Sequence, residues 1–530
     1  MSLDSREFRN LINLIRNSFR VGQNDKPLYV DLGDILSRIG APQHQVVFGR
    51  RGSGKSCLLV HYLNTSHAND VLPVYILADE YKRLTYPDIL IRLLIEIFEA
   101  MPVRARWLKR LLRREIPTQI CADALRRLLD MAAESDVVED RKQTSKRDVR
   151  AKIGWEGVSE VSAGSAADST HGRISHFKER KIDTLERHLH DYKYALSEAM
   201  RGSNKDRSYV FIDDFYLMPR EWHPDILDYI HRLLRDTNVY LKVATIRHRT
   251  QLFRNHPQTV GVELGQDVEE ITLDRTLEDL ELTQEYLGQM LSSMAKKVGI
   301  DNILSEYFNP EALQALTLTS GGVPRDFLNI FVNAVDASLG ENKTKWLTPK
   351  HIYKGAGRLA YQTKLKNIRE DAIGDAGGLE RLNVDLLKFC LREKKKTAFL
   401  ISQDEAQQHP REHDLIQQLM DFKLIHVVEP DTSAASGRPG RYEAYTLDFS
   451  LFMEPRRRNI EIVEFWKIDE NRRRTGIREA PVYPLPRAGV VFDDAAQAAD
   501  AYEVLQEDED ISPPAAASPM PPIQGSLFDE

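Results

Sequence analysis

The sequence predicts an α/β protein in which a parallel sheet with flanking helices is followed by an all-α region and a small domain of helices and a hairpin. Short apolar runs such as HQVVF (44–48) and SYVFIDD (208–214) alternate with helical stretches over the first 270 residues. This alternation is typical of buried parallel strands covered by helices. After residue 273 the pattern is purely helical to about residue 365.

Two further strands and one well-marked helix complete the predicted core. The runs LPVYILAD (72–79) and VYLKVATI (239–246) are apolar enough to be buried strands, and 87–101 has the apolar periodicity of a helix. The stretch between 102 and 200 is mostly helical and interrupts the strand pattern. We therefore expect it to be an insertion into the core.

The last third of the chain predicts a winged helix and a tail. Helical, extended and helical segments precede two strands, KLIHVVE (423–429) and RYEAYTLDF (441–449), which flank a Gly/Pro/Ser-rich loop. The segment after 488 is too polar to form a core, so we expect a disordered acidic tail. The expected regions are a core (1–270) with its insertion (about 102–200), a helical lid (271–370), a winged-helix domain (379–455), a basic extension (456–487) and the tail (488–530).

Composition and charge exclude several classes of protein. Of 530 residues, 73 are basic and 80 acidic, and only three are cysteines, which disfavours a disulfide scaffold or a structural zinc site. No apolar run approaches the length of a membrane span, and the first ten residues lack the order of a secretory signal. We expect a cytoplasmic protein that does not enter membranes. The tail holds ten acids and no Lys or Arg, which leaves a near-neutral body.

A glycine-rich loop between a predicted strand and a predicted helix indicates a phosphate site. It matches G-x-x-x-x-G-K-[ST] at every fixed position and stands in the required strand–loop–helix context. Glycines let backbone N–H groups surround phosphate oxygens, Lys55 would reach the β- and γ-phosphates, and Ser56 would ligate Mg²⁺. The predicted nucleotide-binding residues are Gly49, Arg50, Arg51, Gly52, Ser53, Gly54, Lys55, Ser56 and Cys57.

Two acids at the end of a later strand predict the second half of the metal site. Four apolar residues (209–212) end in Asp213 and Asp214. Asp213 would hold Mg²⁺ through water, and Asp214 would polarise the attacking water. An ordinary strand end is the alternative, and the phosphate loop favours the catalytic interpretation.

Two more segments contribute candidate site residues. Thr245, at the end of the next strand, would lie between the acids and the γ-phosphate, although a plain β-branched strand residue is the alternative. Arg325 follows Gly-Gly-Val-Pro (321–324) in the first turn of a predicted helix, where an arginine opposes the helix dipole and would gain from an anionic partner.

Together these segments resemble AAA+ ATPases, in particular the bacterial branch of origin-recognition/initiator ATPases and STAND signalling NTPases. The resemblance identifies 49–56 as Walker A, 209–214 as Walker B, Thr245 as sensor 1 and Arg325 as the sensor-2 arginine of the lid. It implies an ATPase that uses ATP and Mg²⁺ and assembles into ATP-dependent oligomers. The paired acids and Gly322-Val323-Pro324 favour the STAND side.

The chain departs from this family in two respects. The insertion at about 102–200 is not part of a minimal core, and no large repeat array follows the winged helix. An arginine finger acting on a neighbouring subunit is expected from the family. Arg254 is the first candidate for it and Arg249 the second, and either could be a plain surface arginine.

Basic clusters suggest a DNA partner. One helix interleaves Arg and Lys with Trp and Leu at 104–114, and further clusters lie at 394–396, 456–458 and 472–474, with Arg438 and Arg441 in the wing. The predicted recognition helix (409–422) carries three acids and a lone arginine, so we expect contacts to phosphates rather than to bases. Solvated faces or protein contacts are the alternative.

Three functions are compatible with these features. The first is an ATP-controlled switch acting at DNA, in replication, mobile elements or defence against foreign DNA. The second is a STAND-like signalling or scaffold NTPase whose basic patches bind proteins. The third, a small-molecule kinase, is disfavoured by the two acids and the lid motif.

The end of the tail resembles a docking peptide for the bacterial DNA sliding clamp. Gln524, Leu527 and Phe528 match its glutamine and Leu-Phe positions, and large apolar side chains in a segment without a core favour binding to another protein. A tail that only solubilises the protein is the alternative.

Overall fold

A computed structural model provides the structure of the protein. The chain folds into two compact units, residues 1–352 and 353–530. The described residues are 3–22, 25–31, 33–65, 70–101, 117–144, 169–255, 258–340, 346–366, 368, 376–435, 439–453, 459–468, 474 and 476–494.

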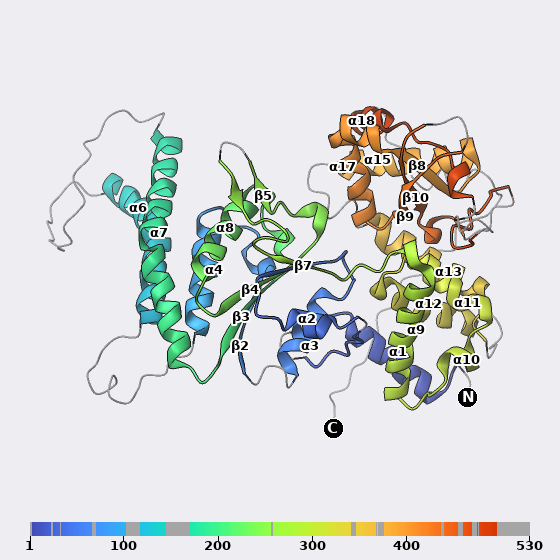
Figure 1. Cartoon of the computed structure of the whole chain (residues 1–530), viewed down its shortest axis with the longest axis horizontal. Helices are drawn as coiled ribbons and strands as arrows, with labels where there is room; N and C mark the ends of the chain where they lie inside the picture. The colour runs from blue at the N-terminus through green and yellow to red at the C-terminus, as the bar shows by residue number, and fades with distance from the viewer. Residues whose placement is uncertain are drawn as a thin grey trace, which may run out of the picture. The chain divides into compact units, whose positions relative to one another are not determined.

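The first unit is built on a parallel sheet of five strands (Figure 1). The spatial order is β2-β3-β4-β1-β7, so the strand that precedes the glycine loop lies between the strands that carry Thr245 and Thr272. This sheet confirms the predicted α/β class. The strands are β1 (Gln45–Phe48), β2 (Val71–Leu77), β3 (Arg207–Asp213), β4 (Val239–Thr245) and β7 (Glu269–Thr272).

Alternation of side chains gives the sheet two buried faces. Val210 and Ile212 of β3 face one core, whereas Tyr209 and Phe211 face the other. Because both faces are covered, every second residue must be apolar on each side, which explains the near-continuous apolar runs of the sequence. The first core is covered by α4 (Asp88–Ala100), α6 (Pro117–Thr144), α7 (Ser169–Gly202) and α8 (His223–Leu234), the second by α2 (Ile35–Ile39) and α3 (Lys55–Asn64).

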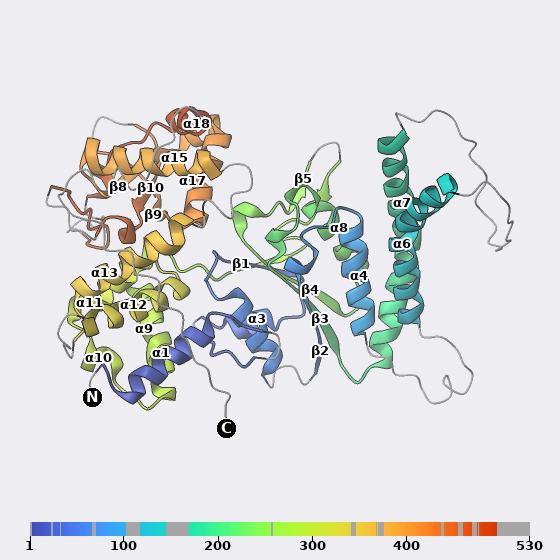
Figure 2. The same cartoon turned by 180° about the vertical axis from the view of Figure 1, so that it is seen from behind.

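The predicted insertion contains two long helices. Figure 2 shows α6 and α7 side by side, on the side of α4 that faces away from the sheet. Lys181 of α7 is buried and its ammonium lies 2.8 Å from a carboxylate oxygen of Asp88, the first residue of α4. Residues 102–116 and 145–168, including the predicted basic helix at 104–114, lie outside the described residues.

A group of helices follows the sheet in the first unit, where the sequence predicts a helical lid. An N-terminal helix, α1 (Arg6–Ser18), joins it through edge-to-face packing of Phe8 on Tyr307, with ring centroids 4.7 Å apart. The sequence analysis did not place this helix there. The lid helices are α9 (Leu280–Lys297), α10 (Ile303–Tyr307), α11 (Pro310–Thr319) and α12 (Pro324–Gly340), and α13 (Pro349–Leu359) follows.

Short elements connect these helices and strands. The hairpin of β5 and β6 lies between β4 and β7. The short elements of the first unit are η2 (Ala78–Tyr81), η3 (Phe215–Leu217), η4 (Arg220–Trp222), η5 (Arg247–Arg249), β5 (Phe253–Arg254), β6 (Val260–Gly261) and η6 (Leu277–Asp279).

The second unit contains a three-stranded antiparallel sheet with the order β8-β10-β9. The sequence predicts a helix, an extended segment, a helix and two strands here; the structure has these elements and one additional short helix, Gln403–Gln408, after the first strand. The elements of this part of the unit are η7 (Ala360–Lys364), α15 (Ala376–Leu387), η8 (Lys388–Lys394), β8 (Ala398–Ser402), α16 (Gln403–Gln408), α17 (Pro410–Asp421), β9 (Ile425–Thr432), β10 (Tyr442–Leu447) and η9 (Phe449–Leu451).

The predicted basic extension is in part a folded piece of this unit. The backbone N–H groups of Leu400 and Tyr483 donate to Pro481 and Leu400 respectively, both at 2.8 Å, so the segment pairs with the free edge of β8. After η10 (Ile477–Glu479), helix α18 (Leu485–Asp493) packs on α15 and α17. The tail therefore begins later than the predicted residue 488.

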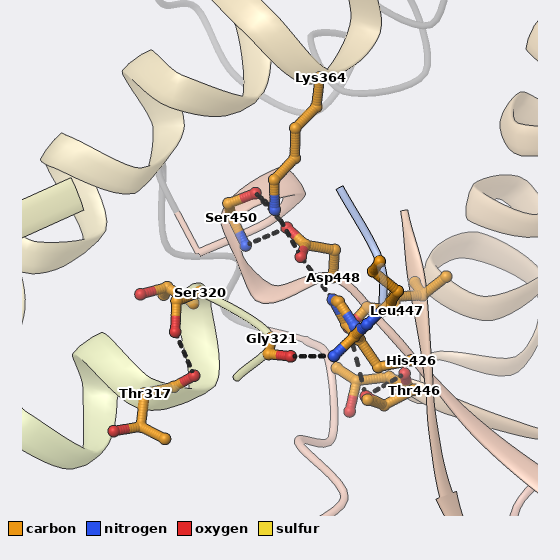
Figure 3. Close-up of polar contacts among 12 residues, drawn as sticks. Thr317, Ser320, Gly321, Lys364, His426, Thr446, Leu447, Asp448 and Ser450 are labelled. Atoms are coloured by element: carbon orange, nitrogen blue, oxygen red, sulfur yellow. Dashed lines mark hydrogen bonds and ion pairs between the residues drawn. The ribbon is translucent and has the colours of Figure 1, made fainter. Parts of the chain in front are cut away.

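A buried polar cluster ties η7 to the sheet of the second unit (Figure 3). The Lys364 ammonium and the His426 ring nitrogen Nε2 lie 2.7 and 2.6 Å from Oδ2 of Asp448, and the Ser450 N–H donates to its Oδ1 at 3.1 Å. All four residues are buried. Burial alone would raise the pKa of the Asp448 carboxyl, but Lys364 and His426 together hold it well below its ordinary value.

Removal of the cation from this cluster should destabilise the second unit. Lys364→Met leaves Asp448 buried without its ammonium partner, which costs about 3–5 kcal/mol of unfolding free energy at pH 7. Urea unfolding followed by tryptophan fluorescence measures it. Because the folded-state pKa of Asp448 is depressed, the loss should be full above about pH 4 and shrink as the pH falls below it. Lys467→Met, in an exposed ion pair with Glu464, is the control, and equal effects of the two changes would contradict the account.

Candidate nucleotide-binding site

The glycine loop lies between β1 and α3, as the sequence predicts. Gly49 donates its N–H to the carbonyl of Thr245 at 3.2 Å, which fixes the start of the loop beside the end of β4. Gly52 and Gly54 have φ values of +92° and +100°, a region that favours glycine. A Cβ on Gly52 would also lie 2.9 Å from Cβ of Arg325, so this glycine permits close approach of the lid.

Lys55 is a buried cation inside this loop. Its ammonium donates to the carbonyls of Gly49 at 2.7 Å and Arg50 at 3.2 Å. Burial lowers the pKa of Lys55, and the carboxylates of Asp214 and Asp213 oppose that shift. An ammonium held only by carbonyls and nearby carboxylates would gain strongly from a phosphate.

The loop fits a bound anion. Ser53 is 6% exposed, and its hydroxyl has no hydrogen-bond partner among the described residues, which leaves a buried polar atom to be satisfied. The loop also precedes the first turn of α3, where helix N–H groups favour negative charge. Ser56, the second residue of α3, is half-buried. Ser56 and Asp213 supply oxygen ligands of the type that Mg²⁺ prefers.

The two predicted acids lie at the end of β3 and differ in environment. Asp213 is buried; its Oδ2 accepts the Tyr75 hydroxyl at 2.7 Å and its Oδ1 accepts the N–H of Asp214 at 2.9 Å. Asp214 has a φ of +53°, which turns the chain away from the strand. Burial and the neighbouring Asp213 charge raise the pKa of Asp214 to about 6, against lowering effects of Lys55 and Arg51. Asp214 can therefore exchange a proton near neutral pH.

Two tyrosines of the site were missed by the sequence analysis. Tyr75 comes from β2, and its pairing with Asp213 depends on a strand register that no local pattern reveals. Tyr216 follows Asp214 by two residues, and its ring lies 5.9 Å from the Lys55 ammonium and 5.8 Å from the Arg249 guanidinium carbon. Burial and the Asp214 charge raise the pKa of Tyr216, so it stays a neutral hydroxyl. Its position directly after the acids was the one available signal.

Thr245 and Arg325 both lie next to the glycine loop. Thr245 is buried opposite Phe48, and its hydroxyl shares a hydrogen bond of 2.5 Å with that of Thr250. The Arg325 N–H donates to the carbonyl of Gly52 at 3.2 Å, and its guanidinium donates to Phe19 at 3.1 Å. The structure thus brings sensor and lid candidates to the predicted loop.

Three predicted loop residues have different surroundings. The guanidinium of Arg50 is buried against Asp274, whereas Arg51 is exposed and its charge acts on Asp214. The Cys57 thiol donates to the Leu28 carbonyl at 3.4 Å, and burial raises its pKa to about 12. The side chains of Arg50 and Cys57 therefore hold neighbouring segments.

The two finger candidates occupy different places. Arg254 lies on the β5–β6 hairpin and makes two contacts of 2.7 Å with the Asp225 carboxylate of α8. Arg249 lies beside Tyr216, within its own chain's site. Both arginines therefore stay candidates for the finger.

Several predicted features fall outside the described residues. These are the basic residues at 104–114, 456–458 and 472–473, Arg438, and the clamp peptide with Gln524, Leu527 and Phe528. In the part of the chain that the structure describes, no helix is long and apolar enough to span a bilayer.

Comparison with known proteins gives matches among solved structures. No protein-family model and no curated protein matches the chain. Among solved structures it is similar to Cdc6p from Pyrobaculum aerophilum, with 13% identity and a TM-score of 0.34 over 82% of this chain and 93% of that one. It is also similar to a lysine-to-arginine mutant of RuvB from Thermotoga maritima, with 11% identity and a TM-score of 0.27 over 69% and 77% of the two chains.

The five-stranded parallel sheet of this chain is the α/β core that the sequence predicts.

Replacement of Asp214 should stabilise the first unit. The folded state raises the pKa of Asp214 from about 4 to about 6, so ionisation of this carboxyl at higher pH destabilises the folded protein. Asp214→Asn removes the ionisable group and should therefore raise the unfolding free energy by about 2 kcal/mol at pH 7.5. Because the penalty grows as pH rises, the gain should vanish below about pH 4. Denaturant unfolding at both pH values measures it, and a loss of stability at pH 7.5 would contradict the assignment.

Proposed function

We propose that the protein is an ATP-binding AAA+ switch that hydrolyses ATP slowly. The observation that carries the proposal is the buried Lys55 ammonium beside the unpartnered Ser53 hydroxyl, in a loop that opens α3 and faces two carboxylates. A glycine turn with an exposed lysine would leave the ammonium in water. Burial of an ammonium costs free energy, and a bound anionic ligand would offset this cost by pairing with the charge.

Each side chain has a definite role in this proposal. The Lys55 ammonium exchanges its carbonyl partners for phosphate oxygens. The Ser53 hydroxyl donates a hydrogen bond to a phosphate oxygen. Ser56 and Asp213 hold Mg²⁺, which neutralises phosphate charge when bound. Asp214 accepts a proton from the attacking water, and its raised pKa favours this step. Its side chain is one methylene shorter than that of glutamate, which favours slow turnover.

Two substitutions separate binding from hydrolysis. Lys55→Ala should abolish ATP binding, whereas Asp214→Asn should bind ATP and lose turnover by about 100-fold or more. Wild-type turnover should fall as the pH drops through about 6, since Asp214 then becomes protonated. Phosphate release and nucleotide-binding assays measure these effects. Normal hydrolysis by Lys55→Ala would show that the site lies elsewhere.

We also propose that ATP drives self-assembly and that Arg254 acts on a neighbouring subunit. Its ion pair with Asp225 leaves the arginine side chain about one-third exposed, so part of the guanidinium is accessible to a second partner. A phosphate on the adjacent subunit would be a stronger partner.

Mixing of two inactive variants tests this action in trans. Arg254→Ala should bind ATP and lose turnover, and addition of Lys55→Ala subunits, which keep Arg254, should restore part of it. Asp225→Ala is the matched control, because it removes the same ion pair and should stay active. Full activity of Arg254→Ala, or equal losses in both variants, would contradict the role.

DNA is the partner that the second unit favours, through phosphate contacts. Helix α17 corresponds to the predicted recognition helix, and Pro410 and Arg411 are its only fully exposed residues. Arg411 is held by Asp493 of α18, with contacts of 2.7 and 3.0 Å. The exposed arginine of this helix is thus paired within the chain, whereas Lys394 and Lys395 are exposed. A signalling role with protein partners remains the alternative function.

Binding should therefore depend on salt and not on sequence. The replacement of Lys394 and Lys395 by alanine should weaken DNA binding equally for unrelated duplexes and reduce the slope of log affinity against log salt by about 2. Arg411→Ala is the comparison and should change little. Absence of binding at low salt would instead favour the signalling alternative.

A further inference from the structure

Adjacent arginines of the glycine loop have opposite surroundings. Arg50 is 7% exposed, whereas Arg51 is exposed. A variable position of a phosphate loop has no need of a buried guanidinium, which is expensive to bury unless its donors are satisfied. The partners of Arg50 therefore indicate what it does.

Arg50 joins the loop to two other segments of the first unit. Its backbone N–H donates to Oδ1 of Asp274 at 2.7 Å, and its Nε lies 3.4 Å from the same oxygen. Its Nη2 donates to the carbonyl of Arg275 at 2.9 Å and to that of Gly321 at 3.2 Å. One planar guanidinium thus connects the loop, the segment after β7 and the turn between α11 and α12.

Glycines and backbone bonds hold the same three segments together. The N–H of Leu273 donates to the Phe48 carbonyl at 2.8 Å, which keeps the segment after β7 beside the loop. Gly322 has a φ of +74°, and a Cβ there would lie 2.6 Å from the Arg275 carbonyl oxygen. Together with the bond from Arg325 to Gly52, these contacts bring the lid turn onto the loop.

The nucleotide lysine contacts the same residue. The Lys55 ammonium donates to the carbonyl of Arg50 at 3.2 Å, so a phosphate that withdraws this ammonium changes the backbone of the residue whose side chain holds the lid. Arg50 therefore connects Lys55 to Gly321: its carbonyl accepts from the Lys55 ammonium, and its guanidinium donates to the Gly321 carbonyl.

We propose that Arg50 is a positioning residue that couples phosphate binding at Lys55 to the order of the lid turn 321–325. The coupling rests on the proposed ATP binding. The contacts of Arg50 with Asp274, Arg275 and Gly321 set the position of the lid turn, and a phosphate that binds Lys55 changes them through the loop backbone.

Hydrogen exchange of the full chain, measured first without nucleotide, tests whether Arg50 holds the lid turn 321–325. Arg50→Met should speed exchange of the amides of residues 275, 321–323 and 325 by about tenfold or more, because bonds to a charged donor are lost. Arg50→Lys keeps the charge but not the planar fork, so it should speed exchange at 321–325 while it keeps the fold. Arg51→Met, one residue away on the exposed side, should leave these amides unchanged.

The same measurement with the β,γ-imido analogue of ATP and Mg²⁺, at saturation, tests the coupling. Wild type and Arg51→Met should show a change in lid exchange on binding, and Arg50→Met and Arg50→Lys should lose most of it. Wild-type binding with an unchanged lid, or a nucleotide response kept in both Arg50 variants, overturns the coupling alone. Absence of nucleotide binding by wild type overturns the proposed function, and the coupling with it.

Discussion

Two cations buried within six residues of each other impose the main constraint on this structure. A charge removed from water needs partners, and the loop between β1 and α3 provides only backbone carbonyls for Lys55. Arg50 obtains its partners from Asp274 and from the lid. The sheet, the lid and the glycine turns therefore place hydrogen-bond acceptors around the two buried cations of one short loop.

This arrangement links the chemistry of the site to the rest of the first unit. The Tyr75 hydroxyl fixes Asp213 through a hydrogen bond. Asp214 has a left-handed backbone conformation and a raised pKa, and both features destabilise the folded protein while they are typical of catalytic groups. Arg325 and Thr245 reach the loop from the lid and from β4. Loop, acids and lid thus form one site built from segments far apart in the sequence.

The sequence predicted local features well and long-range ones poorly. Strand alternation, the glycine spacing and the paired acids are encoded within a few residues, so the sheet and the loop could be predicted. The contact of Tyr75 with Asp213 and that of Arg50 with Gly321 depend on register and on packing of distant segments. Helix α18 was missed because it crosses the predicted boundary at 488 between the basic extension and the tail, although Leu485 and Ala488 are buried.

Chemical labelling of the loop lysine tests the central claim most directly. An acyl phosphate of ATP transfers its acyl group to an amine that lies beside the terminal phosphate, and burial lowers the pKa of Lys55, which favours the nucleophilic form. Peptide mass spectrometry of the full chain should find Lys55 acylated, and excess ATP should prevent the reaction. Labelling of other lysines with Lys55 unmodified would contradict the account.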